Sequence, residues 1–258
     1  SILNRNITSE KLVLDCIERI EAREPVINAW VEFEKERAIE EAKLSDKALS
    51  MGNLKGPLHG LPIALKDIID TCDFPTQNGS RLFKGRRPAQ DAQCVSLLRN
   101  SGAIIMGKTV TTEFALTGAG PTTNPNNILH TPGGSSSGSA ASVADFMVPV
   151  SIGSQTGGSM IRPASYCGIY GFKPSFGSIS RRGVFCLARA LDHLGVYARS
   201  VDDLILLCET LFKYDPSDLD MYEPDCLARV LKPDLNHDDY TPRFACIEGP
   251  AWDFVEPY

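Results

Sequence analysis

Apolar and polar positions near the start of the chain follow helical spacing. Apolar side chains recur at helical intervals over residues 12–20, where Thr8 or Ser9 could cap a helix that ends before Pro25. Residues 34–49 are mostly charged and carry a thin apolar stripe, which is typical of a helix with one solvated face. The first fifty residues therefore predict two helices.

Short apolar runs alternate with helical segments in the next part of the chain. Buried strands are predicted over residues 61–65 with 68–69, over 103–106 and over 148–152. Helices are predicted over residues 90–101, 141–147 and 200–212, the last one beginning at a capping box of Ser200 and Asp203, and a short helix or turn is predicted over residues 160–167. This alternation predicts an α/β fold, a single domain over residues 1–258 with a central sheet flanked by helices on both faces.

Composition and charge narrow the class of protein. The chain has 258 residues, of which 43% are hydrophobic, so it can bury a substantial core. Its net charge is −6 and no basic cluster is present, which argues against nucleic acid or an anionic membrane as partner. Because no signal peptide or membrane-length apolar run is visible, a cytoplasmic protein is expected.

The cysteines do not form a recognisable metal or disulfide pattern. All eight lack CxxC spacing, which favours buried free thiols over disulfides or a zinc site. They are Cys16, Cys72, Cys94, Cys167, Cys186, Cys208, Cys226 and Cys246. The acidic, proline-containing residues 213–241 are expected to form a surface excursion without chemistry.

Residues 133–163 contain two glycine-serine turns on either side of an apolar, helix-length segment. In the second turn, Gly157 and Gly158 lack a Cβ, so the N–H groups of Thr156 and these glycines could converge on one oxyanion. Ser159 would stand at the edge of that donor cluster. A serine hydroxyl becomes a good nucleophile only when a neighbouring base takes its proton.

Lys66 is the candidate base. The four histidines, His59, His130, His193 and His237, stand in no recognisable catalytic frame. Lys66 lies within an apolar run, and burial there would lower its pKa from about 10.4 towards the range that a base requires. The alternative is a lysine at the end of a strand that reaches water or pairs with Asp67.

Three other motifs compete with this interpretation. Residues 102–109 match the Walker A spacing, but the residues between the glycines themselves read as a strand, so nucleotide binding is not expected. Ser136 lies in a G-x-S-x-G pattern, although a loop with two prolines precedes it in place of the required strand. Asp192 and His193 could form an acid–base pair, yet such a pair more often ties down a loop.

Five segments together resemble the amidase signature family of serine hydrolases. They read GLPIALKD, GAIIMGKTVTTEFA, GGSSSG, GSQTGGS and RPASYCG, and the core motifs fall within residues 60–206. The resemblance implies a mixed central sheet and a Ser-cisSer-Lys triad. The matching positions are Ser159 as nucleophile, Ser135 after a cis peptide bond, and Lys66 as base.

The same resemblance assigns the other parts of the site. The oxyanion donors fall on Thr156, Gly157, Gly158 and Ser159 itself. Because a hydroxyl both donates and accepts, Ser135 can pass a proton from the nucleophile to the base and return it to the leaving amine.

Two positions depart from the commoner family pattern. Gln155 stands where the commoner form has an acid, and Arg162 lies one residue later than the usual arginine. Together they resemble the malonamidase-type branch, whose substrates are small amides that carry a carboxylate. The resemblance implies that Arg162, with Gln155 beside it, binds that substrate carboxylate. The alternative for Arg162 is an ion pair under the loop.

The resemblance implies an amidohydrolase that converts a small carboxamide into an acid and ammonia through an acyl-enzyme on Ser159. No cofactor or metal is expected, and the partner is a small-molecule amide, with a homodimer left open as the assembly. One alternative is an amidotransferase-type subunit that supplies ammonia to a partner, and another is an inactive amidase-like binding module. Both ends of the chain look cut, so a fragment is also expected.

Overall fold

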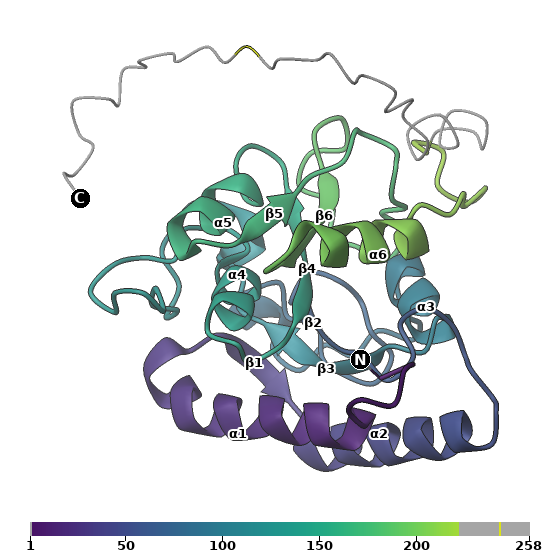
Figure 1. Ribbon diagram of the computed structural model, residues 1–258. Helices are drawn as coiled ribbons and strands as arrows, with labels where there is room; N and C mark the ends of the chain where they lie inside the picture. Colours follow the sequence, from purple (N-terminus) through teal and green to yellow (C-terminus); the bar gives the residue numbers. More distant parts are fainter. Residues whose placement is uncertain (1, 222–242, 244–258) are drawn as a thin grey trace.

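The computed structural model describes residues 2–221 and 243, and these form a six-stranded sheet with helices on both faces (Figure 1). The strand order is β1-β3-β2-β4-β6-β5. The strands are β1 (Trp30–Phe33), β2 (Pro62–Lys66), β3 (Ile104–Thr109), β4 (Val150–Gln155), β5 (Tyr170–Phe172) and β6 (His193–Ala198). The three central strands β3, β2 and β4 are parallel and the outer pairings are antiparallel, so the predicted mixed sheet is confirmed.

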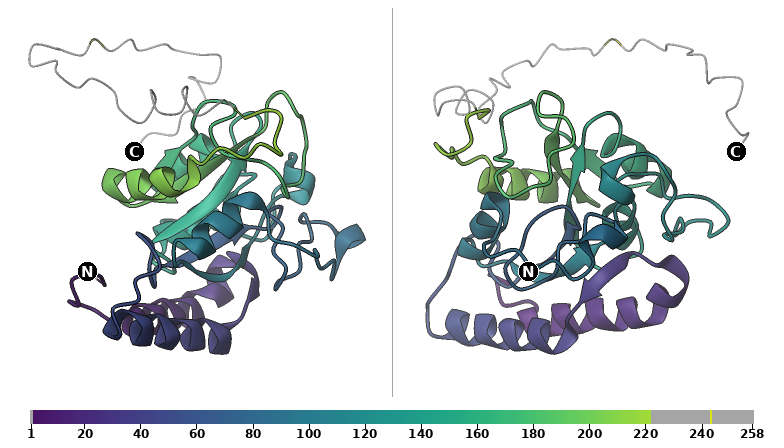
Figure 2. Two further views of the ribbon diagram at one scale, coloured as in Figure 1. Left: turned by 90° about the vertical axis from the view of Figure 1, so that its right-hand side faces the viewer. Right: turned by 180° about the vertical axis from the view of Figure 1, so that it is seen from behind.

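Within residues 2–221, six α-helices cover this sheet. They are α1 (Ser9–Ile27), α2 (Lys35–Ser50), α3 (Gln93–Asn100), α4 (Ser137–Ala144), α5 (Ile161–Cys167) and α6 (Val201–Leu211), with 3₁₀ turns η1 (Arg81–Phe83) and η2 (Glu113–Ala115). Figure 2 shows α6 on one side of the sheet and the pair α1 and α2 on the other. The predicted caps are confirmed, because the Thr8 side chain accepts from the Lys11 N–H and the Ser200 side chain from the Asp203 N–H.

Two hydrophobic clusters lie on the two faces of the sheet and share its strands. One contains Val95 and Leu98 of α3 and Leu204 and Leu207 of α6, packed on Ile63 and Leu65 of β2. The other contains residues of α1, α2, α4 and α5, packed on strand residues that include Ala64 and Tyr197. Alternate residues of β2 therefore enter opposite clusters, as the pleat of a strand requires.

Several element boundaries differ from the sequence-based expectation. Pro25 lies inside α1, which continues for two more residues before Asn28 ends it in the left-handed conformation. The strand β1 between the first two helices was not predicted. Residues 68–69 lie beyond the end of β2, where Ile68 is in a turn and Ile69 forms an isolated bridge with Val184, although both side chains are buried.

Strand β3 is longer than predicted and runs through the whole GKT sequence of the Walker-like motif. The backbone there pairs with β1 and β2, so its N–H groups cannot form a phosphate-binding loop. Among the described cysteines, Cys16, Cys94, Cys167 and Cys208 are buried free thiols as expected, whereas Cys72 and Cys186 are exposed.

Two further expectations concern parts of the chain that are not described. Most of the expected surface excursion over residues 213–241 lies outside the described residues, as do Cys226 and Cys246. None of the helices within residues 2–221 has both the length and the apolar character needed to cross a membrane.

Candidate active site

Lys66 and Ser135 meet at the centre of the sheet. Lys66 is the last residue of β2 and is completely buried, and its Nζ donates to Ser135 Oγ at 2.7 Å and to Ser154 Oγ at 2.8 Å. Ser135 precedes α4, and the peptide bond from Gly134 to Ser135 is cis, as the family resemblance implies. The structure thus joins the two residues across 69 positions of sequence.

The surroundings of Lys66 favour its uncharged form. Burial lowers the pKa of Lys66 from 10.5 to about 7, and the carboxylate of Asp192 opposes this shift more weakly. Within the described residues Lys66 forms no ion pair, and both of its hydrogen-bond partners are hydroxyl groups. The expected alternative, a pair with Asp67, is therefore wrong. Asp67 instead lies 3.5 Å from Lys108.

Ser159 lies in the turn that joins β4 to α5. Its side chain is buried, and its carbonyl accepts from the Tyr197 hydroxyl at 3.1 Å, as does that of Met160. Among the described residues, no acceptor faces the N–H groups of Gly157, Gly158 and Ser159. The Tyr197 hydroxyl thus fixes the turn through two carbonyl groups. The N–H groups of the turn stay available and can donate to an oxyanion.

Gln155, the last residue of β4, holds the nucleophile turn from inside. Its Oε1 accepts from the N–H of Met160 at 2.8 Å and from that of Ile161 at 3.1 Å. These two groups lie at the start of α5, where backbone donors have no partner within the helix. The side-chain oxygen of Gln155 is thus engaged with the turn. This geometry favours a structural role for Gln155 over contact with a substrate.

Arg162 ties the two glycine-serine turns together. Its Nε and Nη2 donate to the carbonyl of Gly134 at 3.2 and 2.7 Å, next to the cis bond. The expected alternative of an ion pair under the loop is not found among the described residues. Arg162 is exposed and lines a cavity of about 290 Å³ together with Gly133, Gly134 and Tyr166.

Ser136 has a structural position. Its hydroxyl donates to the Ser154 carbonyl at 3.0 Å and accepts from the Ser154 N–H at 3.2 Å. The hydroxyl thus satisfies both backbone groups of Ser154 near the end of β4, as a neighbouring strand would. Ser136 is completely buried. The G-x-S-x-G pattern therefore does not expose its serine as a nucleophile elbow would.

The side chains of Asp192 and His193 bond different partners in the structure. Asp192 Oδ1 accepts from Thr156 Oγ1 at 2.6 Å, and Asp192 Oδ2 accepts from the N–H groups of Leu187 and Ala188, both at 2.8 Å. His193 Nδ1 instead bonds the Leu191 carbonyl at 2.6 Å. The pair is not an acid–base unit, and Asp192 ties down a loop, as the alternative stated.

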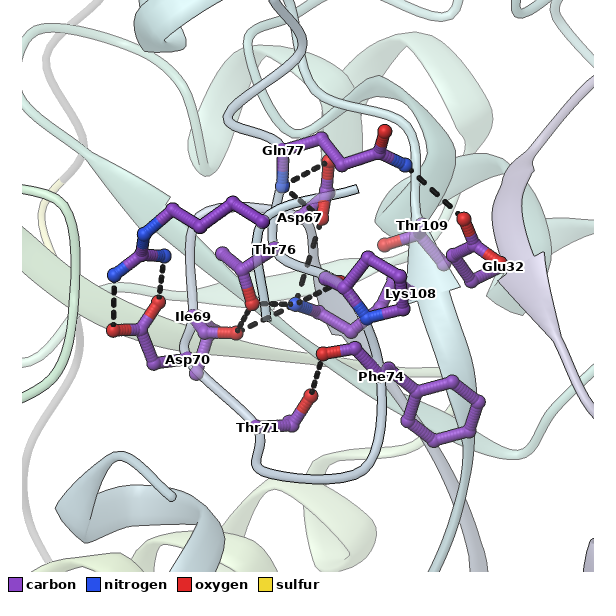
Figure 3. A network of polar contacts seen from close by, with 12 residues as sticks. Glu32, Asp67, Ile69, Asp70, Thr71, Phe74, Thr76, Gln77, Lys108 and Thr109 are labelled. Atoms are coloured by element: carbon purple, nitrogen blue, oxygen red, sulfur yellow. Dashed lines mark hydrogen bonds and ion pairs between the residues drawn. The ribbon is translucent and has the colours of Figure 1, made fainter. Parts of the chain in front are cut away.

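A second buried lysine, Lys108, lies on β3 next to β2 and was missed by sequence reasoning. Its Nζ donates to the Ile69 carbonyl at 2.6 Å and to Thr76 Oγ1 at 2.7 Å, and it lies 3.5 Å from Asp67 (Figure 3). Burial lowers the pKa of Lys108 to about 8, while Asp67 opposes the shift. Lys108 lies just beyond the strand predicted over residues 103–106, so no signal in the sequence indicated that its side chain is buried.

A larger cavity of about 310 Å³ opens beside Ser154 and Thr156. It is lined by apolar side chains of the loop between β5 and β6, including Val184, Phe185 and Leu187, and by Arg181 and Asp192. Arg181 is already paired with Asp220. The larger cavity thus lies on the Thr156 side of the candidate site, and the smaller cavity lies on its Arg162 side.

One group of potential metal ligands occurs among the described residues, away from this site. The ligand atoms of Cys72, Asp73 and Asp91 lie within 4.8 Å of one another. Arg99 donates to both carboxylates, and Arg37 pairs with Asp73 as well. These cations already pair with both carboxylates, so the cluster is explained as an ion-pair network.

Comparisons with known proteins identify the family of the chain. A family model described as Amidase matches residues 11–257. A glutamyl-tRNA(Gln) amidotransferase subunit of Lawsonia intracellularis is 43% identical over 223 residues, which cover 84% of this chain and 46% of that protein. The corresponding protein of Acidothermus cellulolyticus is 38% identical over 243 residues, which cover 91% of this chain and 48% of that protein. This chain therefore spans about half the length of the curated relatives it matches.

A solved structure gives the same result for the fold. The peptide amidase of Stenotrophomonas maltophilia superposes with a TM-score of 0.80 at 35% identity. The match covers 84% of this chain and 47% of that chain. The resemblance seen in the motifs therefore extends to the sheet and its helices.

Proposed function

Since this chain belongs to the amidase signature family, we propose that it contributes the catalytic centre of a serine-dependent amide hydrolase. The observation that carries the proposal is the 2.7 Å separation of buried Lys66 Nζ and Ser135 Oγ, across which an uncharged amine can accept from the hydroxyl. Lysine residues are rarely buried without a carboxylate partner. A neutral Lys66 with hydroxyl partners is ready to accept a proton.

In the proposed reaction, Ser159 Oγ attacks the amide carbonyl carbon and forms a C–O bond. Its proton passes to Ser135 Oγ, while the proton of Ser135 passes to Lys66 Nζ, which becomes an ammonium. The carbonyl electron pair moves onto oxygen, where the N–H groups of Thr156, Gly157, Gly158 and Ser159 donate to it. The relay through Ser135 connects the turn that carries the nucleophile to a base that stays buried.

The tetrahedral intermediate then collapses with cleavage of the C–N bond. Lys66 returns its proton through Ser135 to the leaving nitrogen, so ammonia departs as a neutral molecule. Water attacks the ester on Ser159 through the same relay and releases the acid. Lys66 ends the cycle uncharged, as it began.

The proposal is tested by mapping which serine a small sulfonyl fluoride modifies. We expect the adduct on Ser159 and its loss in Lys66→Ala, because the hydroxyl is activated only while the base is present. Ser165→Ala is the matched control, since Ser165 is an exposed serine of α5 and should leave labelling unchanged. Modification elsewhere, or equal labelling of Ser159 without Lys66, contradicts the proposed role.

For the substrate, we propose a small carboxamide that carries a carboxylate, held by Arg162. Support comes from the position of its guanidinium at the Gly134 carbonyl, next to Ser135, on the wall of the smaller cavity. Replacing Arg162 with Ala is expected to raise the KM for malonamate more than that for a neutral amide such as propionamide. An equal loss for both amides would show that Arg162 only supports the turn.

An amidotransferase-type subunit is the second candidate function, because several relatives are subunits of glutamyl-tRNA(Gln) amidotransferases. Such a protein would use the same triad to release ammonia from an amide for a partner. Gln155 and Arg162 depart from the commoner pattern and favour the hydrolase. Ammonia release from glutamine that requires an added partner protein, with none from malonamate, would favour the amidotransferase.

A further inference from the structure

Asp192 is the carboxylate that connects the candidate oxyanion turn to the wall of the larger cavity. Its Oδ1 accepts from Thr156 Oγ1 at 2.6 Å, and Thr156 is the first residue after β4. Its Oδ2 accepts from the N–H groups of Leu187 and Ala188, both at 2.8 Å. One side chain therefore fixes the turn and the neighbouring loop relative to each other.

We infer that Asp192 is a positioning residue for the proposed reaction, which holds the oxyanion turn through Thr156 and places a negative charge near Lys66. The inference rests on the proposed function, since it assigns a task within that site. It goes beyond the triad, because Asp192 touches neither the nucleophile nor the relay serine.

The bond to Thr156 is well placed to control the oxyanion donors. Three glycine or serine residues follow Thr156, and nothing lies within 4 Å of the place where a Cβ on Gly157 would stand. The turn has little side-chain packing on that side, so its position depends on its ends. Gln155 and Tyr197 hold the end near α5, and Asp192 holds the end near β4.

The charge of Asp192 acts on Lys66 through space. Other titratable or charged groups around the site come from different elements and have their own partners: Asp67 after β2, Lys108 of β3, Arg162 of α5 and Tyr197 of β6. Asp67 and Lys108 lie 3.5 Å apart and largely compensate each other. Asp192 is thus the carboxylate whose removal should change the titration of Lys66.

The sign of that change follows from the charges. A nearby carboxylate favours the ammonium form and raises the pKa of Lys66, against the larger lowering caused by burial. Without the carboxylate, Lys66 loses its proton at lower pH. The base form is then present at lower pH, and the midpoint of a base-dependent rate shifts downwards.

The test is the pH dependence of Ser159 modification by a small sulfonyl fluoride, followed by mass spectrometry of the intact protein and its peptides. In Asp192→Asn we expect a lower midpoint than in the wild type and a plateau rate reduced by about tenfold, because the single amide oxygen cannot accept from both Thr156 and the N–H groups of Leu187 and Ala188. Asp192→Glu restores the charge and should return the midpoint towards the wild-type value.

Thr156→Val tests the hydrogen bond between Thr156 and Asp192 separately from the charge of Asp192. It removes the bond to Asp192 but keeps the carboxylate, so the plateau rate should fall while the midpoint stays. Asp220→Asn is the matched control, because Asp220 is a carboxylate of the same cavity that pairs with Arg181 and Arg189 and does not contact the turn. Both midpoint and plateau should be unchanged in that variant.

The outcomes distinguish this inference from the proposed function. An unchanged midpoint in Asp192→Asn, or an unchanged plateau in Thr156→Val, overturns the role of Asp192 while Ser159 still reacts. Absence of any adduct on Ser159 in the folded wild-type protein overturns the proposed function, and the role of Asp192 with it.

Discussion

Lys66 shows how the surroundings of one side chain determine its chemistry. Its Nζ has two hydroxyl partners, and burial lowers its pKa to about 7. Lys108 is also buried, but it has carbonyl, hydroxyl and carboxylate partners. These partners are those expected for a lysine with a structural role. Two buried lysines on neighbouring strands thus have different roles because their partners differ.

This titration predicts how activity depends on pH. A base must be uncharged to accept a proton, so kcat/KM should rise with pH through a midpoint near 7, well below the ordinary lysine value. The measurement is the initial rate of ammonia release from about pH 5.5 to about pH 9 at low substrate concentration. Lys66→Arg, which stays charged, should remain inactive at every pH.

Gln155 gives a second prediction at the residue scale. In Gln155→Leu the N–H groups of Met160 and Ile161 lose their acceptor, so the turn that carries Ser159 should loosen. We expect kcat to fall by about tenfold or more, since small misplacements of a nucleophile are costly. The measurement is steady-state ammonia release.

Gln155→Glu is the conservative comparison, because its carboxylate can accept the same two bonds. Its kcat should stay within a few-fold of the wild type. Loss of activity in both variants would mean that the amide group of Gln155 itself contacts the substrate, as the family resemblance implies.

Single residues were predicted where a motif identifies them. Lys66 was found from a charge in an apolar run and Ser159 from the second glycine-serine turn, whereas Ser135 came from the family resemblance. Ser154, Asp192 and Lys108 were not assigned their partners, because each contact joins positions far apart in sequence. Nothing in local spacing shows that Asp192 meets Thr156, 36 residues away.

At the scale of elements, the network around Lys108 fixes the segment after β2 to β3 (Figure 3). Lys108 Nζ bonds the Ile69 carbonyl and Thr76 Oγ1, while Asp67 accepts from the Gln77 N–H at 3.0 Å. This segment begins directly after Lys66. The network therefore supports the position of the strand end that carries the proposed base.

Removing one partner of this buried pair predicts a large loss of stability. Lys108→Met leaves the Asp67 carboxylate buried without its cation, so we expect the free energy of unfolding to fall by about 3–5 kcal/mol. Urea unfolding followed by circular dichroism measures the change. The exposed Lys84 provides the control, and Lys84→Met should change stability by less than about 0.5 kcal/mol.

The double variant Asp67→Asn with Lys108→Met tests the explanation itself. If the uncompensated carboxylate causes the loss, the double variant should be less destabilised than the sum of the two single variants. Additive losses would mean that the two side chains act independently, and the ion-pair explanation would be wrong.

Element types were predicted better than their ends. Helical periodicity identified the long helices and short apolar runs identified the central strands, because both patterns reflect burial. Pro25 was expected to follow α1, yet the helix includes it and ends at Asn28. Strand β1 has only four residues and a mostly half-buried pattern, so it carries too little periodicity to be recognised.

At the scale of the whole molecule, the two hydrophobic clusters share one sheet, which favours a single cooperative unit. Burial raises the pKa of Cys94 and Cys208 to about 12 in one cluster, and that of Cys16 and Cys167 to about 12 in the other. A thiol reacts as its thiolate, so these four should resist alkylation while the sheet is intact. Exposed Cys72 and Cys186 provide the internal reference for accessible thiols.

Pulsed alkylation at increasing urea concentration, read by peptide mass spectrometry, tests the expected single domain. Because Ile63 and Leu65 of β2 pack in one cluster and Ala64 in the other, neither cluster can open without disrupting the strand that carries Lys66. We therefore expect Cys94 and Cys208 to become reactive at the same urea midpoint as Cys16 and Cys167. Two separate midpoints would mean that the faces of the sheet unfold independently, so that the proposed base could lose its surroundings on one face while the other stayed folded.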